Sequence, residues 1–296
     1  MGVVTANIQD PHWGMYIVWY FFLGGIAGGA YFTAAIADYF GGPRERQMAK
    51  IGYYIAWPLT VICGILLILD LGTPSRFLNM LREFKWQSPM SVGAWGLAVF
   101  GAFATVSAVL AYFERGPMPV LSLSEADRLR YRRLVGLVGT LAGFFLASYT
   151  GVLLGSTAIP MWTESRLMGA LFLASAASTG VASIALVAWL RGLDLGETWN
   201  RIHRFDRFAI VWEAVLLAAL LVMLGGAAEP IVSGRYALLF WVGLVAIGLV
   251  APFVLQLRTG HHSGRPTFAL ALPALLVLVG GFVLRYVVIM SGPYHG

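Results

Sequence analysis

The sequence has few charged residues and a single cysteine. Only 11% of the 296 residues are charged, 59% are hydrophobic, and the mean hydropathy is +0.77. A soluble domain carries about a quarter charged residues, so this composition excludes an ordinary water-soluble enzyme. It also excludes a disordered chain, which needs the opposite balance. With Cys63 alone, the chain forms no internal disulfide and ligates no iron–sulfur cluster of its own.

Histidines are absent from the apolar segments, which excludes a bis-histidine haem held between membrane helices. The sequence therefore predicts neither haem nor metal in this chain. No basic region precedes the first apolar segment, so residues 1–11 are expected to be a mature N-terminus without a signal peptide. The five histidines are His12, His203, His261, His262 and His295.

Long apolar runs dominate what remains. Eight of them reach about 18 residues or more, enough to cross a hydrocarbon core of about 30 Å. Continuous runs of this length predict helices rather than a β-barrel. We expect an all-α integral membrane protein in one domain, 1–296, with eight transmembrane helices in two four-helix bundles. The predicted spans are 15–39, 51–71, 91–113, 134–156, 167–190, 208–225, 236–256 and 268–290.

Basic residues are distributed unevenly over the connections. Fourteen Lys and Arg lie in the connections on one side and five on the other, with Arg285 inside the last span. The positive-inside rule places the richer side in the cytoplasm and both termini in the periplasm of a bacterial inner membrane. This distribution explains the net charge of +6 without a nucleic-acid partner. In the inner connection 114–133, Ser124 begins a predicted short surface helix.

Ionisable residues within spans cost free energy and are functional candidates by default. Asp38 and Asp70 lie near span ends, where an interface residue and a functional group are equally good interpretations. Glu213, about one and a half turns into the sixth span, favours a role in a proton path with Asp206. Arg285 shares the outer depth of Asp70, which is compatible with a pair between them. The small-residue runs 24–30 and 174–180 favour close helix packing over a flat ligand site.

Most aromatic residues near span ends, including Tyr20, fit an interfacial belt. Tyr149 is different, because a phenol in the outer half of a span needs a hydrogen-bond partner, and a ligand carbonyl could supply it. His12, Tyr149 and Asp70 all map to the outer face. A histidine and a tyrosine can donate to quinone carbonyls and a carboxylate can pass the proton, so these three form a hypothetical quinone site.

Four segments in order resemble the NrfD/PsrC family of membrane subunits from polysulfide reductase and related quinone-linked complexes. They are YFFLGGIAGG at 20–29, LDLGTPSRF at 69–77, SPMSVGAWGL at 88–97 and YTGVLLGSTAIPMW at 149–162.

The resemblance implies a haem-free anchor that binds menaquinone or ubiquinone near the outer face. It further implies electron exchange with a periplasmic four-cluster iron–sulfur protein, together with a molybdopterin catalytic subunit. Tyr149 and His12 match quinone-contacting positions, and Asp70 lies in the motif implicated in proton chemistry. Some members carry that acid later, at the position of Gly72.

Two other functions stay open. A secondary transporter or proton channel would use Asp38, Glu213 and Arg285 along an alternating-access path. A pure anchor would tether a partner without redox work. The basic outer loop with Arg76, Arg82, Lys85 and Trp86 is either a docking surface or a solvated loop near headgroups.

Overall fold

In the computed structural model the chain is all-helical over the residues that the structure describes, which are 14–71, 82–114, 124–157, 159–163, 166–258 and 267–292. Eight helical segments in these ranges are long and apolar enough to cross a membrane, as predicted. The long helices are α1 (Met15–Phe40), α2 (Pro43–Asp70), α4 (Pro89–Tyr112), α5 (Glu125–Gly155), α7 (Met168–Leu190), α8 (Thr198–Leu224), the π-helical η3 (Leu239–Val250) continued by α10 (Ala251–Arg258), and α11 (Phe268–Ser291). The short ones are α6 (Pro160–Thr163), η2 (Gly225–Ala228) and α9 (Glu229–Val232).

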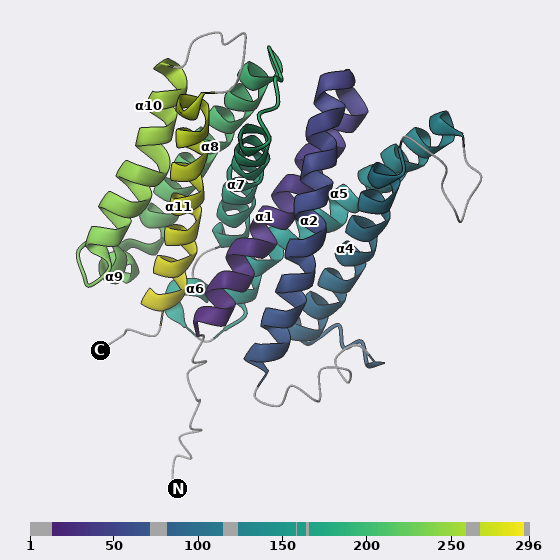
Figure 1. Ribbon diagram of the computed structural model, residues 1–296. Helices are drawn as coiled ribbons and strands as arrows, with labels where there is room; N and C mark the ends of the chain where they lie inside the picture. Colours follow the sequence, from purple (N-terminus) through teal and green to yellow (C-terminus); the bar gives the residue numbers. More distant parts are fainter. Residues whose placement is uncertain are drawn as a thin grey trace, which may run out of the picture.

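Two groups of helices lie side by side in Figure 1. We call α1, α2, α4 and α5 the first group and α7, α8, η3–α10 and α11 the second group. Helix α7 touches both α1 and α5, and so connects the two groups. The start of α1 and the end of α11 lie at one end of the molecule, here called the terminal end; the opposite end, where α1 leads into α2, is called the basic end.

The contact between α1 and α7 depends on glycine. A Cβ placed on Gly29 would run into the Ala176 carbonyl oxygen, and one on Gly180 would run into the backbone of Gly29. The two helix backbones therefore touch at a point where neither can carry a side chain. This confirms that the two small-residue runs serve helix packing.

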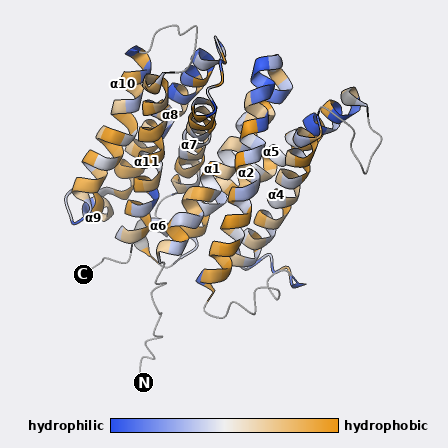
Figure 2. Cartoon of the chain, in the orientation of Figure 1, coloured by the Kyte–Doolittle hydropathy of each residue, from blue (hydrophilic) through white to orange (hydrophobic). Residues whose placement is uncertain are grey.

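Three helices begin earlier at the basic end than the apolar runs predict. Helix α2 begins at Pro43 rather than residue 51, and α8 begins at Thr198 rather than 208. Helix α5 begins at Glu125, where the Ser124 hydroxyl accepts the Asp127 amide at 3.1 Å. The predicted helix start is thus confirmed, but the predicted short surface helix is wrong, because it is the first part of α5. Figure 2 shows these extra turns as hydrophilic caps on apolar helices.

Candidate functional site

A small polar cavity lies near the terminal end of the first group, enclosed by α1, α2, α4 and α5. Its volume is about 30 Å³, and its polar wall is made by Tyr20, Asp70 and Tyr149. The structure therefore brings together two of the three predicted site residues. The third, His12, lies outside the described residues.

Tyr149 is buried, with 7% of its surface exposed. Its ring stacks on Phe145, with the ring centroids 5.2 Å apart, and its hydroxyl donates to the Pro89 carbonyl at the start of α4. A Cβ on Gly93 would collide with the Tyr149 ring, so only glycine admits the phenol at this place. The phenol thus has the partner it requires, and that partner is a backbone carbonyl of the neighbouring helix.

Tyr20 is the cavity residue that the sequence analysis missed. The sequence analysis placed Tyr20 in the interfacial belt. In the structure only 2% of its surface is exposed, and it lies in the cavity wall with Ile17 of the same helix. The spacing of three residues between Ile17 and Tyr20 puts both on one helix face. The belt residues Tyr16 and Trp19 of the same helix are both exposed. Tyr16 also stands at helical spacing from Tyr20, four residues before it, so spacing alone does not separate Tyr20 from the belt.

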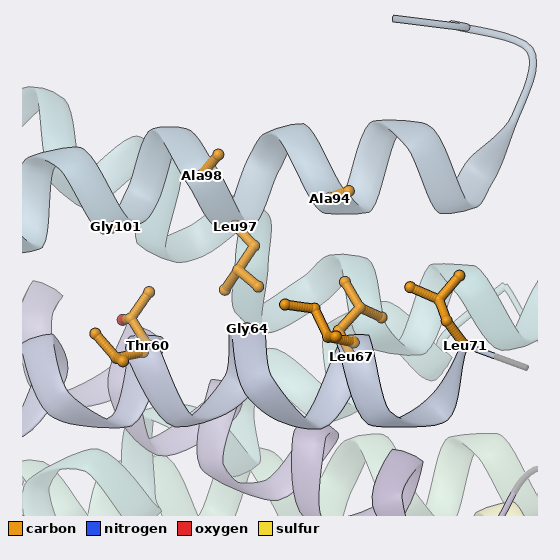
Figure 3. Close-up of a pocket in the computed structure, with 10 residues that line it drawn as sticks. Thr60, Gly64, Leu67, Leu71, Ala94, Leu97, Ala98 and Gly101 are labelled. Atoms are coloured by element: carbon orange, nitrogen blue, oxygen red, sulfur yellow. The ribbon is translucent and has the colours of Figure 1, made fainter. Parts of the chain in front are cut away.

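An apolar groove adjoins this cavity between α2 and α4. Its volume is about 290 Å³, and it shares Leu67 and Ala94 with the walls of the polar cavity. Figure 3 shows how α2 and α4 run along the two sides of the groove. One face of α2 supplies Thr60, Gly64, Leu67 and Leu71, and α4 supplies Ala94, Leu97, Ala98 and Gly101.

A second cluster of polar side chains, here called the buried column, runs through the middle of the second group. Glu213 lies 15 residues after the start of α8, about four turns along it, because α8 begins ten residues before the predicted span. Asp206, on the same face and seven residues earlier, lies about 10 Å nearer the basic end. Both are nearly inaccessible, at 3% exposed.

Neutral groups hold the carboxylates of this column. The Ser178 hydroxyl donates to Asp206 at 2.7 Å, and the Gln256 amide donates to its other oxygen at 2.5 Å. The Ser175 hydroxyl hydrogen-bonds Glu213 and also meets Arg285 Nη1 at 3.0 Å. Ser175 therefore links the carboxylate at mid-depth to the guanidinium nearer the terminal end.

Arg285 is fully buried at the terminal end of this column, where α11 meets α1. It donates to the carbonyls of Phe21 at 3.1 Å and Gly281 at 2.8 Å, and its guanidinium lies 5.3 Å from the Phe172 ring centroid. Its Nη2 has no hydrogen-bond partner among the described residues. These contacts place Arg285 against α1 and α7, rather than in the pair with Asp70 that depth alone allowed.

Asp38 belongs to a different cluster, at the basic end of the first group. The Arg132 guanidinium donates one hydrogen bond to each carboxylate oxygen of Asp38, at 2.5 and 2.6 Å, and both side chains are almost completely buried. Arg132 also donates to Glu114 at 2.9 Å, which Lys50 approaches to 2.5 Å. Burial raises the pKa of Glu114, but the hydrogen bonds and charges of Lys50 and Arg132 outweigh it and hold that pKa below its ordinary value.

The predicted proton path therefore divides between two places. Asp206, Glu213 and Arg285 lie in the buried column, whereas Asp38 is bound by Arg132 in the other group. The sequence analysis missed Ser175, Ser178, Gln256 and Arg132. Ser175 and Ser178 stand three residues apart on α7, and hence on one face, which is a pattern that could have marked them.

Similarity to known proteins extends over almost the whole chain. The family described as polysulphide reductase, NrfD, matches residues 3–294. The chain belongs to this family. The resemblance read from the four motifs is thereby confirmed.

Three relatives illustrate the range of the NrfD family. A polysulfide reductase chain of Wolinella succinogenes is 30% identical, over 95% of this chain and 93% of its own length. Protein NrfD of Escherichia coli is 27% identical, over 97% and 96% of the two chains. A selenate reductase subunit of Mesobacillus selenatarsenatis is 19% identical, over 97% of this chain and 75% of its own. Proteins named as parts of a polysulfide reductase and a selenate reductase thus match this chain over at least 95% of its length.

Proposed function

We propose that the chain is a quinone-binding membrane anchor of a respiratory oxidoreductase complex. One observation carries the proposal: a polar cavity with two phenols and a carboxylate opens beside an apolar groove, in a membrane chain of the NrfD family. Menaquinone and ubiquinone match this pair of sites, because each has a small ring with two carbonyls, for the polar cavity, and a long apolar tail, for the groove. The family membership and the groove support a ligand of this class.

The groove between α2 and α4 fits the tail, since its lining is almost wholly apolar and Val61 on its wall is half exposed toward the lipid side. The polar cavity fits the carbonyl end. At about 30 Å³ it holds a water molecule rather than a ring, so binding requires a side chain to move. Met90 is suited to that movement, because it lies in the cavity wall, is 53% exposed and has a flexible side chain.

Three side chains then divide the chemistry. Tyr149 exchanges the Pro89 carbonyl for a ligand carbonyl, Tyr20 packs on the ring, and Asp70 accepts or returns a proton. Oxidation of a quinol releases two electrons and two protons, so a carboxylate beside the cavity is the group this reaction needs. His12 would contact the second carbonyl.

The electrons require a partner, because this chain has no predicted redox group. We infer a periplasmic four-cluster iron–sulfur protein at the terminal end and a molybdopterin catalytic subunit beyond it. Relatives named as parts of polysulfide and selenate reductases support that assignment. In this arrangement the two helix groups are two four-helix bundles of one domain in a bacterial inner membrane, with both termini in the periplasm. Exposed Phe84, Lys85 and Trp86 at the terminal end offer a docking surface.

The test is turnover with quinol in the intact complex. Tyr149→Phe is expected to lower kcat by about tenfold, because it removes the hydrogen bond to the ligand carbonyl, and Asp70→Asn by about a hundredfold, because it removes the carboxylate that transfers the proton. Tyr112→Phe is the matched control, because that phenol is 72% exposed at the basic end. Unchanged turnover in both site variants would exclude a redox role and leave the pure anchor.

We infer a second function, proton transfer through the buried column, from a specific observation: two carboxylates and a guanidinium are buried in line, and a serine joins Glu213 to Arg285. Asp206 would receive protons from the basic end and pass them to Glu213, while Arg285 would act on Glu213 by its positive charge and through Ser175 without taking up a proton itself. Reconstituted in vesicles, Glu213→Gln should keep quinol turnover and lose the accompanying acidification. Acidification equal to that of the unmodified complex would remove this function, and with it the transporter alternative that uses Glu213 and Arg285.

A further inference from the structure

A third cavity, here called the seam cavity, lies at the basic end where α1 and α2 meet α7 and α8. Its volume is about 220 Å³, and most of its wall is apolar, with Met48, Val181 and Ile202 among the lining residues. On the α1 side the lining residues Ile36 and Phe40 are 41% and 81% exposed. Apolar side chains this exposed on a membrane helix face lipid, so the seam cavity opens toward the bilayer.

One residue of the seam-cavity wall has a hydroxyl without a hydrogen-bond partner among the described residues. Thr33 lies in the wall with 9% of its surface exposed, and its Oγ1 makes no hydrogen bond with any described residue. A buried hydroxyl without a hydrogen-bond partner destabilises the structure that holds it. Helical threonines usually relieve this cost by bonding a carbonyl one turn back, as Thr60 does with Ala56 at 2.7 Å. The hydroxyl is shielded from the cavity in the present side-chain rotamer, so an acceptor on a bound molecule would satisfy it once the Thr33 side chain turns about its Cα–Cβ bond.

The rim of the seam cavity is positively charged. Glu45 is held by the Thr198 hydroxyl at 3.1 Å and by Arg201 Nη1 at 3.0 Å, while Arg201 itself stays 66% exposed. Arg204 follows one turn later on α8 and is exposed, and the Arg44 guanidinium lies against Gly196. Of these charged residues Glu45 and Arg201 line the cavity itself, so the positive charge of the rim comes from Arg44 and Arg204 next to them along α2 and α8.

We propose that the seam cavity binds an anionic phospholipid of the leaflet at the basic end. Its phosphate would bind Arg201, an ester carbonyl would accept from the Thr33 hydroxyl, and one acyl chain would fill the apolar interior. Thr33 lies about 10 Å below the end of α1, the depth of the layer between headgroups and hydrocarbon. The volume is below the roughly 300–1,000 Å³ of a complete small-molecule site, as expected for a ligand whose second acyl tail stays in the bilayer.

The lipid would also join the two helix groups, because the seam cavity takes its walls from both. This site is separate from the polar cavity, which lies at the opposite end of α1 and α2. The inference therefore stands or fails independently of quinone binding.

The experiment measures lipid binding by the purified, detergent-washed complex. Native mass spectrometry and the melting temperature are recorded on adding phosphatidylglycerol, phosphatidylcholine or inorganic phosphate. We expect saturable binding and a higher Tm with phosphatidylglycerol only. Equal effects of phosphatidylcholine would contradict the charged rim, and an equal effect of inorganic phosphate would replace the lipid by a free anion.

Variants assign the contacts. Thr33→Val should weaken phosphatidylglycerol binding about fivefold, the value of one hydrogen bond, and Thr33→Ser should restore it. Arg201→Ala should weaken it about tenfold or more, because a charge-assisted bond is lost. Arg258→Ala, which removes an exposed cation at the same end on α10, is the control. Equal losses for Arg201→Ala and Arg258→Ala would mean general attraction to the basic end and would overturn the site.

Ala37→Phe tests the cavity itself, since it fills the interior from α1 without removing a charge. It should abolish bound phospholipid while quinol turnover stays unchanged. Retention of phospholipid by a folded Ala37→Phe complex, or release of a quinone in its place, would overturn the proposal.

Discussion

In the first group of helices, Asp38 and Arg132 neutralise each other through two hydrogen bonds, and Glu114 and Lys50 extend the pair toward the surface. In the second group, Asp206 and Glu213 are as deeply buried but are bonded to serine hydroxyls and a glutamine amide. In an ion pair each charged side chain stabilises the charged form of the other, so neither readily gains or loses a proton. Carboxylates held by neutral donors keep the freedom to gain or lose a proton. The comparison separates a structural use of buried charge in the first group from the proton transfer that we propose for the second group.

The largest effect is expected where the ion pair is broken. Arg132→Ala leaves the Asp38 carboxylate fully buried without its partner, and should lower the free energy of unfolding by about 3–5 kcal/mol. Arg130→Ala, on the exposed face of the same helix, should change it by less than about 0.5 kcal/mol. Thermal unfolding in detergent measures both, and similar values for the two variants would argue against the structural role of the pair.

Removing both charges sharpens the same point. The double variant Asp38→Leu with Arg132→Met should recover most of the stability lost by Arg132→Ala, because the cost lies in the unpaired charge rather than in the absent bond. A double variant as unstable as the single one would indicate that packing, not charge, decides the loss.

An intermediate effect is expected from the hydroxyl that holds Asp206. Ser178→Ala removes one of two donors to that buried carboxylate and should cost about 1–2 kcal/mol. Ser183→Ala is the control on the same helix, since its hydroxyl bonds only the Thr179 carbonyl of its own helix. A loss of unfolding free energy as large as that of Arg132→Ala would mean that the buried carboxylates of the two helix groups depend on their partners to the same degree, which would contradict the comparison.

The smallest effect is expected from pH. The pKa of Glu114 is held below its ordinary value of 4.5 in the folded chain, so its stabilising contribution is complete above that value and is lost as the pH falls further. Because Glu114 is partly exposed, solvent screening keeps the contribution well under about 1 kcal/mol. Melting temperatures between pH 6 and 3.5 should fall slightly less in Glu114→Gln than in the unmodified protein; a steeper fall in the variant would contradict the sign.

Hydropathy located all eight spans but not the true helix ends. The first turns of α2, α5 and α8 all contain Arg, with Glu and Gln added in α2 and Glu in α5, and these residues form helix readily in water. A hydropathy pattern reports the thickness of hydrocarbon, whereas the backbone continues its hydrogen bonding beyond it. Glu213 is therefore further from the start of α8 than from the start of the predicted span.

The candidate sites were predictable to different degrees. Tyr149 and Asp70 stood out as polar groups in apolar runs, and the structure places both in one cavity wall. Tyr20 did not stand out, because a tyrosine near a span end looks the same whether it faces lipid or a cavity. The seam cavity left no mark in the sequence, since its walls come from four helices that are distant along the chain.

By itself the sequence determined the membrane setting, the eight helices, the glycine runs for close packing and the family motifs, because each depends on residues within one segment. Only the tertiary structure decided which buried charges meet. Asp38 and Arg132 are 94 residues apart and form an ion pair. Asp38 and Glu213, which the sequence analysis assigned to one proton path, belong to different clusters. The physical reason is that the position of a residue along its helix sets its depth, whereas its neighbours at that depth depend on how the helices pack side by side.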